Sequence, residues 1–442
     1  MGLQEFVDSG SVGHGVFQRK KGAKLPLLIL YDVAKCHKYK ALFSEKQPDV
    51  AGWTVPLSYF CAIITCHSMS LRTRIGQFLA LMGWSLLWSL HLGVFFYTLL
   101  IYYLLGWLPL EHWLAGMLMI TLPVAWLMLI LLGLFWLFSR PRRGILSVIG
   151  LLLGYWLVPR TLAFHTPKTA GEGVETFTLL SYNVSAFGLE SYYKDPQRRV
   201  PLKARQLTDW AVRHPAGIKC FQEFYNGDQA PTFHMVARLE EAGYRYHAFL
   251  YSDDRGSIGV ATFSRHPIIA HGQHSFNSSN GLVWSDIQIG NDTIRVINVH
   301  LQSMGIRVRQ VFKEGDISVV KAETRSVLGA LKIGFKARQG EVRVIEKLIK
   351  RSPYPVLVTG DFNDTPYSVV YERLRRLLPN AFEDAGHGFG FTLNQAPRTI
   401  RIDNQFFDPR LKILDFITHH DQPNSDHYPI EGRYVLSSRK KS

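Results

Sequence analysis

Two long apolar runs without Asp, Glu, Lys or Arg limit the folds that are open to this chain. They extend from Phe78 to Leu110 and from Trp113 to Phe138. About 20 apolar residues in a helix cross the hydrocarbon layer of a bilayer, so each run is long enough to span a membrane. A buried core helix is the alternative, but two consecutive runs with Trp and Tyr near their ends favour insertion. We therefore expect a membrane protein.

A third apolar run, Gly144 to Pro159, decides on which side of the membrane the rest of the chain lies. As a helix it measures about 24 Å, which is slightly short of the roughly 30 Å hydrocarbon layer. Arg residues within 72–74 and 140–143 predict cytoplasmic flanks before the first run and after the second. Two spans leave the rest of the chain in the cytoplasm, and three place it outside. We expect three, with an extracytoplasmic C-terminal domain in the cell membrane.

The net charge of +15 is concentrated around these runs. Residues 1–170 carry 15 Lys and Arg against 6 Asp and Glu, whereas residues 171–442 carry 35 against 29. One basic stretch remains in the globular part, since residues 301–351 hold 12 basic and 5 acidic side chains. A solvated helix face, attraction to anionic lipid headgroups and nucleic-acid binding are its three explanations, and membrane tethering favours lipid over nucleic acid.

The composition changes along the chain and predicts five regions. Residues 1–68 are expected to be a dispensable N-terminal extension, or to precede a true start at Met69, because Met69 precedes a short Arg-containing stretch and the first apolar run. Residues 69–160 form the membrane region and residues 161–175 a polar linker. A globular domain follows at 176–436, with a basic tail at 437–442.

The globular region alternates between short β-type runs and helical patterns, which predicts an α/β sandwich. The strands are expected at Thr176–Val184, Gly217–Gln222, Ser257–Ser264, Thr293–Leu301, Pro355–Gly360, Thr399–Phe407 and His427–Val435. The helices are expected at Lys203–Arg213, Thr232–Ala242, within Gly315–Lys350 and at Val369–Leu378.

Acids, amides and histidines recur where these strands end, which is where an α/β sheet presents side chains to a ligand. They are Asn183, Glu223, His300, Asp361 with Asn363, Asp403, and Asp426 with His427. Taken singly, each has a structural explanation, such as a turn residue, a cap or a core histidine. Their recurrence at strand ends favours a shared site.

Two segments carry most of this information. In Gly360-Asp361-Phe362-Asn363, strand alternation predicts that Asp361 and Asn363 share one face, with Phe362 on the other. Ser425-Asp426-His427 supplies an adjacent acid and imidazole, which can serve as a metal ligand and a general base. A further acid, such as Asp403, can orient the imidazole.

With these segments in view, the sequence resembles the endonuclease/exonuclease/phosphatase superfamily of deoxyribonuclease I-like phosphoesterases. Seven short segments match in the family's order: 180–184 (LSYNV), 220–223 (CFQE), 264–268 (SRHPI), 298–301 (NVHL), 360–363 (GDFN), 401–403 (RID) and 425–427 (SDH). The resemblance covers residues 176–435. It implies a four-layer α/β/β/α sandwich, preceded here by transmembrane helices, and a metal-dependent phosphoesterase activity.

The resemblance also implies a metal site. Glu223 would be the principal Mg²⁺ ligand, with Asp426 nearby and Asn183 positioning the phosphate or a metal-bound water. Mg²⁺ takes few protein carboxylates and keeps several waters, which two acids satisfy. Mn²⁺ has overlapping ligand preferences and is expected to substitute.

The catalytic roles come from the same resemblance. His427 would be the general base or the imidazole that polarises the phosphate, oriented by Asp403. Asp361 would align or deprotonate the attacking water. Asn363 would bind a phosphoryl oxygen, and His300 would contact the scissile phosphate.

The sequence departs from the family pattern at two places. Asn404 and Gln405 follow Asp403, where many members have an aromatic residue, and Ser185 stands where the nuclease branch often has an acid. The second departure disfavours an apurinic-type nuclease. The alternatives are a noncatalytic phosphate-binding module or, if the domain is cytoplasmic, an intracellular nuclease. A transporter is disfavoured, because the spans carry only His91 as an ionisable group and a translocation pathway usually holds charged residues.

The expected partners follow from this interpretation. They are the lipid bilayer and a phosphate ester, which is a phospholipid headgroup, a nucleic acid or an inositol phosphate. No obligate protein partner is inferred. Specificity in such folds lies in loops and added helices, so the motifs do not select among these substrates.

Overall fold

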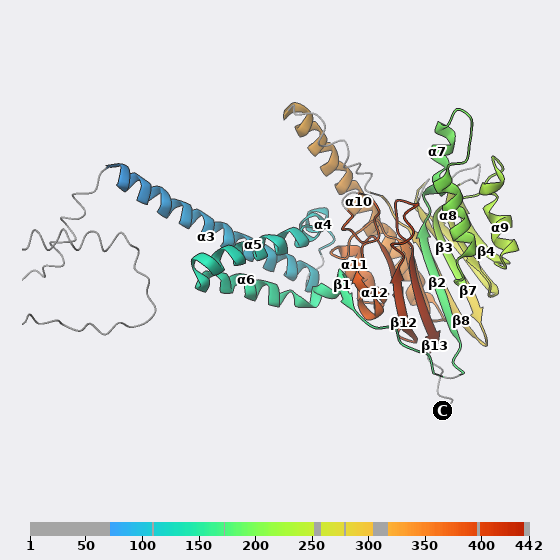
Figure 1. Ribbon diagram of the computed structural model, residues 1–442. Helices are drawn as coiled ribbons and strands as arrows, with labels where there is room; N and C mark the ends of the chain where they lie inside the picture. The colour runs from blue at the N-terminus through green and yellow to red at the C-terminus, as the bar shows by residue number, and fades with distance from the viewer. Residues whose placement is uncertain are drawn as a thin grey trace, which may run out of the picture. The chain divides into compact units, whose positions relative to one another are not determined.

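The computed structural model describes residues 71–107, 110–171, 173–251, 258–277, 280–303, 317–395 and 398–436 (Figure 1). The expectations for residues 1–68 and 437–442 lie outside these ranges. The chain divides into two compact units, Met1–Ser89 and Leu90–Ser442. The first unit contributes the start of helix α3 (Leu71–Gly106), and the remaining described elements belong to the second.

Both long apolar runs are helical, as predicted. Two stretches, Ile75–Gly106 within α3 and Trp113–Ser139, are long and apolar enough to cross a membrane. The second comprises α4 (Trp113–Met119) and α5 (Leu122–Ser139). By length and composition, these two stretches are candidate membrane spans.

The third run forms a shorter helix than the expected span. Helix α6 (Pro141–Leu153) has 13 residues, about 20 Å at 1.5 Å per residue, and the 3₁₀ turn η1 (Tyr155–Arg160) follows it. Since the hydrocarbon layer is roughly 30 Å thick, α6 alone does not cross it. The number of spans, and with it the side of the globular domain, stays a prediction.

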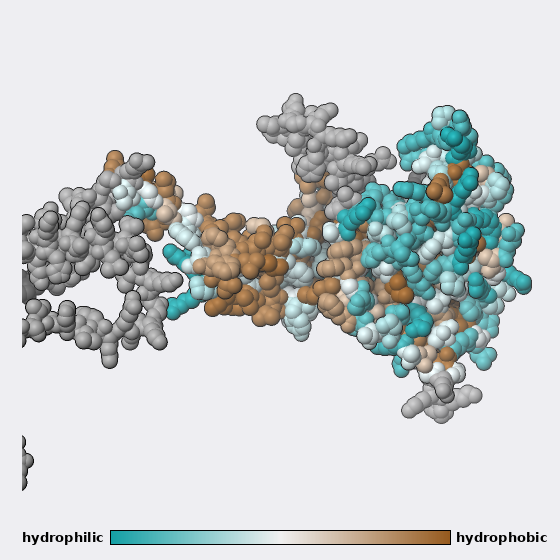
Figure 2. All heavy atoms as spheres, in the orientation of Figure 1, coloured by the Kyte–Doolittle hydropathy of each residue, from teal (hydrophilic) through white to brown (hydrophobic). Residues whose placement is uncertain are grey.

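Helices α5 and α6 pack closely because small residues line their contact. A Cβ atom at Gly133 would lie 2.9 Å from Cβ of Ser147, and Gly144 and Gly150 are buried on the same side of α6. Such small-residue stripes let helix backbones approach each other in membranes. Figure 2 shows apolar side chains gathered over this helical region, as expected of lipid-facing helices.

The described strands of the globular domain form two main sheets, together with a short pair, β1 (Leu162–Phe164) and β10 (His387–Phe389). The six-stranded sheet has the order β12 (Leu411–Thr418), β13 (Ile430–Leu436), β2 (Thr176–Asn183), β3 (Ile218–Tyr225), β5 (Ile258–Ser264), β4 (Tyr246–Tyr251). The five-stranded sheet has the order β11 (Asp403–Phe407), β9 (Val356–Asp361), β8 (Asp292–His300), β7 (Gly281–Ile289), β6 (Ile268–Ser275).

The two sheets pack face to face over an apolar core. Leu179 and Ile218 of the six-stranded sheet and Val296 and Leu357 of the five-stranded sheet belong to this core and are fully buried or nearly so. Alternate residues of the same strands point outwards, where helices cover them.

The helices complete a four-layer sandwich (Figure 1). Helices α8 (Leu202–Arg213) and α9 (Met235–Glu241) pack on the six-stranded sheet through Leu207 and Leu239. Helices α10 (Ile317–Arg351) and α11 (Val369–Arg375) pack on the five-stranded sheet. Shorter elements are η2 (Ser185–Gly188), α7 (Leu189–Lys194), η3 (Pro231–Phe233) and α12 (Ala381–Ala385). The predicted fold class is confirmed.

All seven predicted strands and all four predicted helices are present, but six of the described strands were not predicted. They are β4, β6, β7 and β12 of the two main sheets and the short pair β1 and β10. Strand β6 is an edge strand whose residues are mostly exposed, and its sequence IIAHGQHS lacks apolar alternation. Hydrogen bonding to the neighbouring strand, which periodicity does not report, is what makes such a segment a strand.

Candidate active site

The strand register places three of the predicted residues side by side. His300 at the end of β8 is paired with Asp361 at the end of the parallel strand β9. Asp361 is paired in turn with Asp403 at the start of the antiparallel strand β11. A histidine and two acids that are far apart in sequence therefore form a row across one edge of the five-stranded sheet.

The six-stranded sheet contributes Asn183 and Glu223 to the same edge. Asn183 ends β2, and its partner in the parallel strand β3 is Gln222, the residue before Glu223. The pairing of β3 with β5 is irregular between Phe221 and Phe224, and Glu223 has φ of +49°. This bulge leaves the Glu223 side chain 41% exposed, and re-aiming a side chain is a common use of bulges near functional sites.

One carboxylate oxygen, Oδ2 of Asp361, is the point at which the site converges. Asn183 Nδ2 donates to it at 3.0 Å and Asn363 Nδ2 at 3.3 Å. The Nε2 atoms of His300 and His427 each lie 3.7 Å from it. Asp361 is 1% exposed, so its contacts are made away from bulk water.

Asn363 reaches Asp361 through a turn and not along the strand. Strand β9 ends at Asp361, and Asn363 has φ of +50°. Its backbone N–H donates to Asp361 Oδ1 at 2.8 Å, and its side chain donates to the carbonyl of Leu301 at 2.9 Å. Phe362 packs into the core under α11. The expected proximity of Asp361 and Asn363 is observed, but the continuous strand on which we based it is wrong.

His427 and Asp403 form a buried pair. Nδ1 of His427 lies 2.8 Å from Oδ2 of Asp403, and Oγ1 of Thr392 accepts from the backbone N–H of Asp403 at 3.1 Å. Burial raises the pKa of Asp403. Burial alone would lower the pKa of His427, but the carboxylates of Asp403 and Asp361 outweigh it and hold that pKa well above its usual value.

Asp426, which directly precedes His427, is hydrogen-bonded to two neighbours. Its carboxylate accepts from Gln395 Nε2 at 3.0 Å and from Ser425 Oγ at 3.2 Å. Glu223, its expected metal-binding partner, accepts from Asn183 at 3.3 Å and lies 3.8 Å from His300. In the part of the chain that is described, the site group with converging ligand atoms is Asp361, Asp403 and His427.

The donor set is suited to a hard divalent cation. Glu223 has an accessible carboxylate beside the amide of Asn183, and the buried Asp361 carboxylate accepts from that same amide. Carboxylate and amide oxygens are the ligands that Mg²⁺ takes, and the exposure of Glu223 leaves room for the waters that Mg²⁺ keeps.

Helix α10 holds the segments that directly follow His300 and Asn363. Arg338, which is fully buried, donates to Asp364 Oδ2 at 3.1 Å and to the carbonyl of Gln302 at 2.9 Å. The N–H of Gln302 donates to Glu341 Oε2 at 3.0 Å. The basic composition of this helix did not indicate that Arg338 and Glu341 are buried. The one local signal was Asp364, which directly follows the matched GDFN segment.

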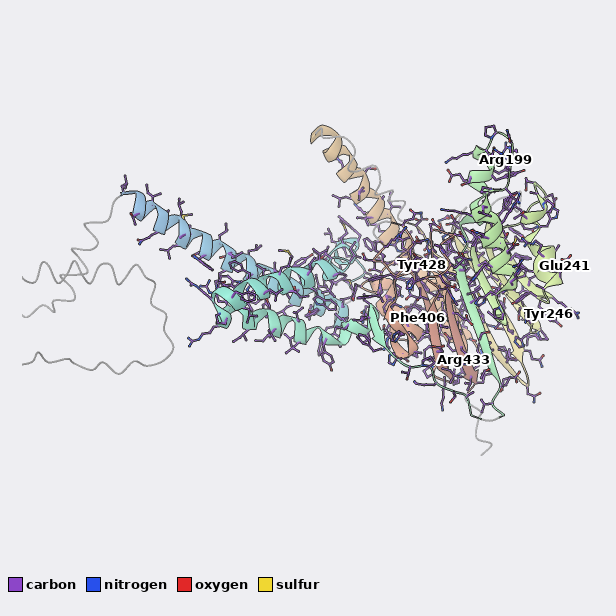
Figure 3. The ribbon with its side chains drawn as sticks, viewed as in Figure 1. Arg199, Glu241, Tyr246, Phe406, Tyr428 and Arg433 are labelled. Carbon is purple, nitrogen blue, oxygen red and sulfur yellow. The ribbon has the colours of Figure 1, made fainter. Side chains whose placement is uncertain are left out.

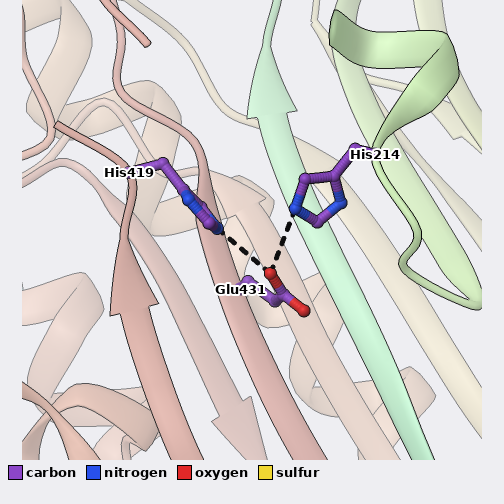
Figure 4. Close-up of side chains that lie close together, drawn as sticks. All are labelled: His214, His419 and Glu431. Atoms are coloured by element: carbon purple, nitrogen blue, oxygen red, sulfur yellow. Dashed lines mark hydrogen bonds and ion pairs between the residues drawn. The ribbon is translucent and has the colours of Figure 1, made fainter. Parts of the chain in front are cut away.

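A second cluster of possible metal-binding side chains was not predicted, because its members are distant in sequence. Oε2 of Glu431 lies 3.2 Å from Nε2 of His214 and 3.0 Å from Nε2 of His419 (Figure 4). Although burial opposes it, hydrogen bonding to these histidines lowers the pKa of Glu431 to about 2. The N–H of Ala216 donates to Nδ1 of His214, so Nε2 carries the proton and donates to Glu431. The cluster is therefore a hydrogen-bonded network that joins the C-terminal end of α8, the residue after β12 and strand β13.

Two protein-family profiles match parts of the chain. The profile of the Endonuclease/Exonuclease/phosphatase family matches residues 180–427, which include all eight predicted site residues. A second profile, described as a domain of unknown function (DUF8431), matches residues 84–161. No curated protein matches the chain.

Three of the solved structures that are similar to the chain come from two bacteria and from human. The endonuclease/exonuclease/phosphatase from Bacteroides vulgatus is 16% identical, with 59% of this chain and 99% of that chain covered and a TM-score of 0.44. That from Beutenbergia cavernae is 15% identical, covering 59% and 72%, with a TM-score of 0.43. The human Nocturnin catalytic domain with bound sulfate is 14% identical, covering 59% and 94%, with a TM-score of 0.39.

The His427–Asp403 pair generates a titration prediction. In metal-free, detergent-solubilised protein, the pKa of His427 should lie well above its usual value and fall in Asp403→Asn, because that change removes the adjacent negative charge. Histidine-selective NMR over a pH series measures it. Asp421→Asn, which removes an acid beside His419, is the control and should leave the His427 value unchanged. An ordinary pKa in the unmodified protein would contradict the prediction.

Proposed function

Because the chain belongs to the endonuclease/exonuclease/phosphatase family, we propose that it is a membrane-tethered hydrolase that cleaves a phosphate ester, most simply a phosphodiester, with a divalent metal ion. The family's members are hydrolytic phosphoesterases that generally use divalent metals. One observation carries the proposal: two amides and two histidines from both sheets converge on the buried carboxylate of Asp361.

The metal ion that we propose is Mg²⁺, with Mn²⁺ as a substitute. Glu223 would be its principal ligand, and Asn183 would position the phosphate or a metal-bound water. Asp426, in the loop before β13, would be a further metal ligand. When bound, such an ion neutralises charge on the non-bridging oxygens of the phosphate.

The side chains around Asp361 are placed to act on water and phosphate. Asp361 would align the attacking water and receive its proton, since its Oδ2 faces the shared centre of the site. His427, whose Nδ1 is held by Asp403, presents Nε2 to the same centre and would polarise a phosphoryl oxygen. His300 and Asn363 would bind the remaining oxygens, because amide and imidazole N–H groups stabilise the charge that develops there.

Membrane tethering is the second part of the proposal. It is supported by the two apolar stretches, Ile75–Gly106 and Trp113–Ser139, with the bilayer as partner. We propose a multi-pass protein of the cell membrane with its catalytic domain on the outer side, because Arg flanks predict cytoplasmic ends for the first and third runs.

Metal removal tests the central claim. Full-length protein should hydrolyse an aryl phosphodiester in the presence of Mg²⁺, lose the activity on treatment with EDTA, and regain it with Mg²⁺ or Mn²⁺. The reason is that hard oxygen donors dominate the exposed part of the site. Release of the aryl alcohol, followed by absorbance, measures the rate. Activity that survives thorough chelation would refute the metal assignment.

Substitutions in the site should separate catalysis from folding. His427→Ala, Asp361→Ala and Asn363→Ala are each expected to lower kcat by roughly two orders of magnitude or more, as groups that act in the transition state do. Thermal unfolding of each variant is measured in parallel. His420→Ala, a change in an exposed neighbouring histidine, is the control. Three well-folded variants with near-full activity would leave only a phosphate-binding module.

Protease accessibility tests the orientation. Protease added to intact spheroplasts should digest residues 176–435 and leave a membrane-embedded fragment, because three spans place the domain outside. A cytoplasmic marker protein that stays intact shows that the membrane is sealed. Protection of the domain until the membrane is broken would instead mean two spans and a cytoplasmic domain.

A further inference from the structure

The loop that begins at the candidate site ends on the apolar helices. The carbonyl of Pro366 accepts from Arg160 at 3.0 Å. The hydroxyl of Tyr367 lies 2.8 Å from Oγ1 of Thr161, and its ring packs edge-on against Trp126 in the first turns of α5, with 5.9 Å between centroids. Tyr367 is six residues after Asp361, so the two residues lie at most about 20 Å apart. The site therefore lies close to the end of the apolar helices.

Helix α10 makes a second contact with the same end. A Cβ atom at Gly116 of α4 would lie 2.8 Å from the Phe335 ring, so the two helices touch closely. Lys332 Nζ lies 5.0 Å from the ring centroid of Trp113. Glu111, between the two candidate spans, forms ion pairs with Arg343 and Arg373. Because α10 also holds the loops of the site, the catalytic domain is docked on the helix ends and does not swing on a free linker.

Exposed aromatic side chains lie between the helix ends and the site. Phe164 of β1 is 75% exposed and Phe389 of β10 is 54% exposed, and the Phe389 ring stacks on Phe391 with 5.1 Å between centroids. Two residues further on, Leu393 forms a β-bridge with His427. Exposed aromatics beside spanning helices are typical of the headgroup layer of a bilayer, where their rings are partly buried.

The charge of α10 complements an anionic lipid surface. Exposed basic side chains of this helix include Lys332 and Lys336, beside the contact with α4, and Lys347 and Lys350 further along the helix. Basic residues at a membrane surface attract anionic headgroups. The helix contacts, the exposed aromatics and the basic side chains Lys332 and Lys336 thus lie at the end of the domain that meets the apolar helices.

We propose that the substrate is a phosphate ester anchored in the bilayer, a lipid headgroup, which the docked site hydrolyses at the membrane surface. This rests on the proposed hydrolase function. Water attacks phosphorus and a P–O bond to the leaving group breaks, so that the leaving group departs with the electron pair and the proton of the water passes to the site or solvent. The lipid is left in the membrane as a phosphomonoester, or the headgroup is released as one.

Two probes with the same scissile bond test this. Hexadecyl 4-nitrophenyl phosphate is anchored in a membrane, and ethyl 4-nitrophenyl phosphate is soluble. Full-length protein is reconstituted in vesicles of digalactosyl diacylglycerol with a minor fraction of sulfoquinovosyl diacylglycerol, which is anionic but contains no competing phosphate. With Mg²⁺, the ratio of kcat/KM for the anchored over the soluble ester should be at least tenfold higher than the ratio measured for a soluble phosphodiesterase on the same vesicles.

Surface variants identify the contacts responsible. Phe164→Ser combined with Phe389→Ser, and separately Glu111→Lys, should lower turnover of the anchored ester several-fold and leave that of the soluble ester unchanged. Tyr246→Ser and Glu241→Lys are matched controls, because these exposed residues lie on β4 and α9, well apart from Tyr428 beside the site (Figure 3). The controls should leave both rates unchanged.

The outcomes separate this inference from the proposed function. Turnover of neither ester would overturn the hydrolase assignment itself. Turnover of the soluble ester without preference for the anchored one, or an equal effect of the variants on both esters, would overturn the membrane-anchored substrate and leave the hydrolase in place.

Discussion

Polar bridges between the two sheets determine where every site residue lies. Burial of apolar surface holds the sheets together, but it is non-directional and does not fix how one sheet is offset against the other. The offset is fixed by buried hydrogen bonds: Gln222 to Asn298 at 2.7 Å, Gln405 to the carbonyl of Leu179 at 3.1 Å, and Asn183 to Asp361 at 3.0 Å. A slip of one sheet would leave these groups unpaired, and an unpaired buried polar group costs about 1–3 kcal/mol. The last of the three bonds is at once a structural bridge and part of the site.

This explains why Asn404 and Gln405 stand where an aromatic residue is common in the family. Asn404 accepts from Arg401 at 2.8 Å, and Gln405 both donates across the sheets and accepts from the Tyr434 hydroxyl at 2.7 Å. The departure therefore leaves Asp403 in place, because the strand that carries it is tied to the facing sheet by hydrogen bonds where an aromatic ring would do so by packing.

The sequence was informative where local pattern and chemistry coincide. Apolar runs predicted the helices α3 to α5. Polar residues at strand ends predicted the candidate site residues, and seven of these eight contact other members of the set. It failed where position depends on the partner strand: β6 has no apolar alternation, and the turn at Asn363 replaces the strand that alternation predicted. The His214, His419 and Glu431 network has the same cause, since only the fold brings three distant side chains together.

The charges of the site also bear on what it is built to hold. Asp361 and Asp403 are paired directly across adjacent strands and both are buried, so their carboxylates repel each other in a medium of low dielectric. The proton on His427 offsets one of these charges, and the amides of Asn183 and Asn363 stabilise the other without neutralising it. Glu223 adds a third carboxylate, held at the rim by a backbone with φ of +49°, and such strain persists only where the surrounding structure enforces it. The remaining negative charge is what a bound divalent cation would neutralise, and an accessible acid beside a buried one gives that cation a way in from solvent.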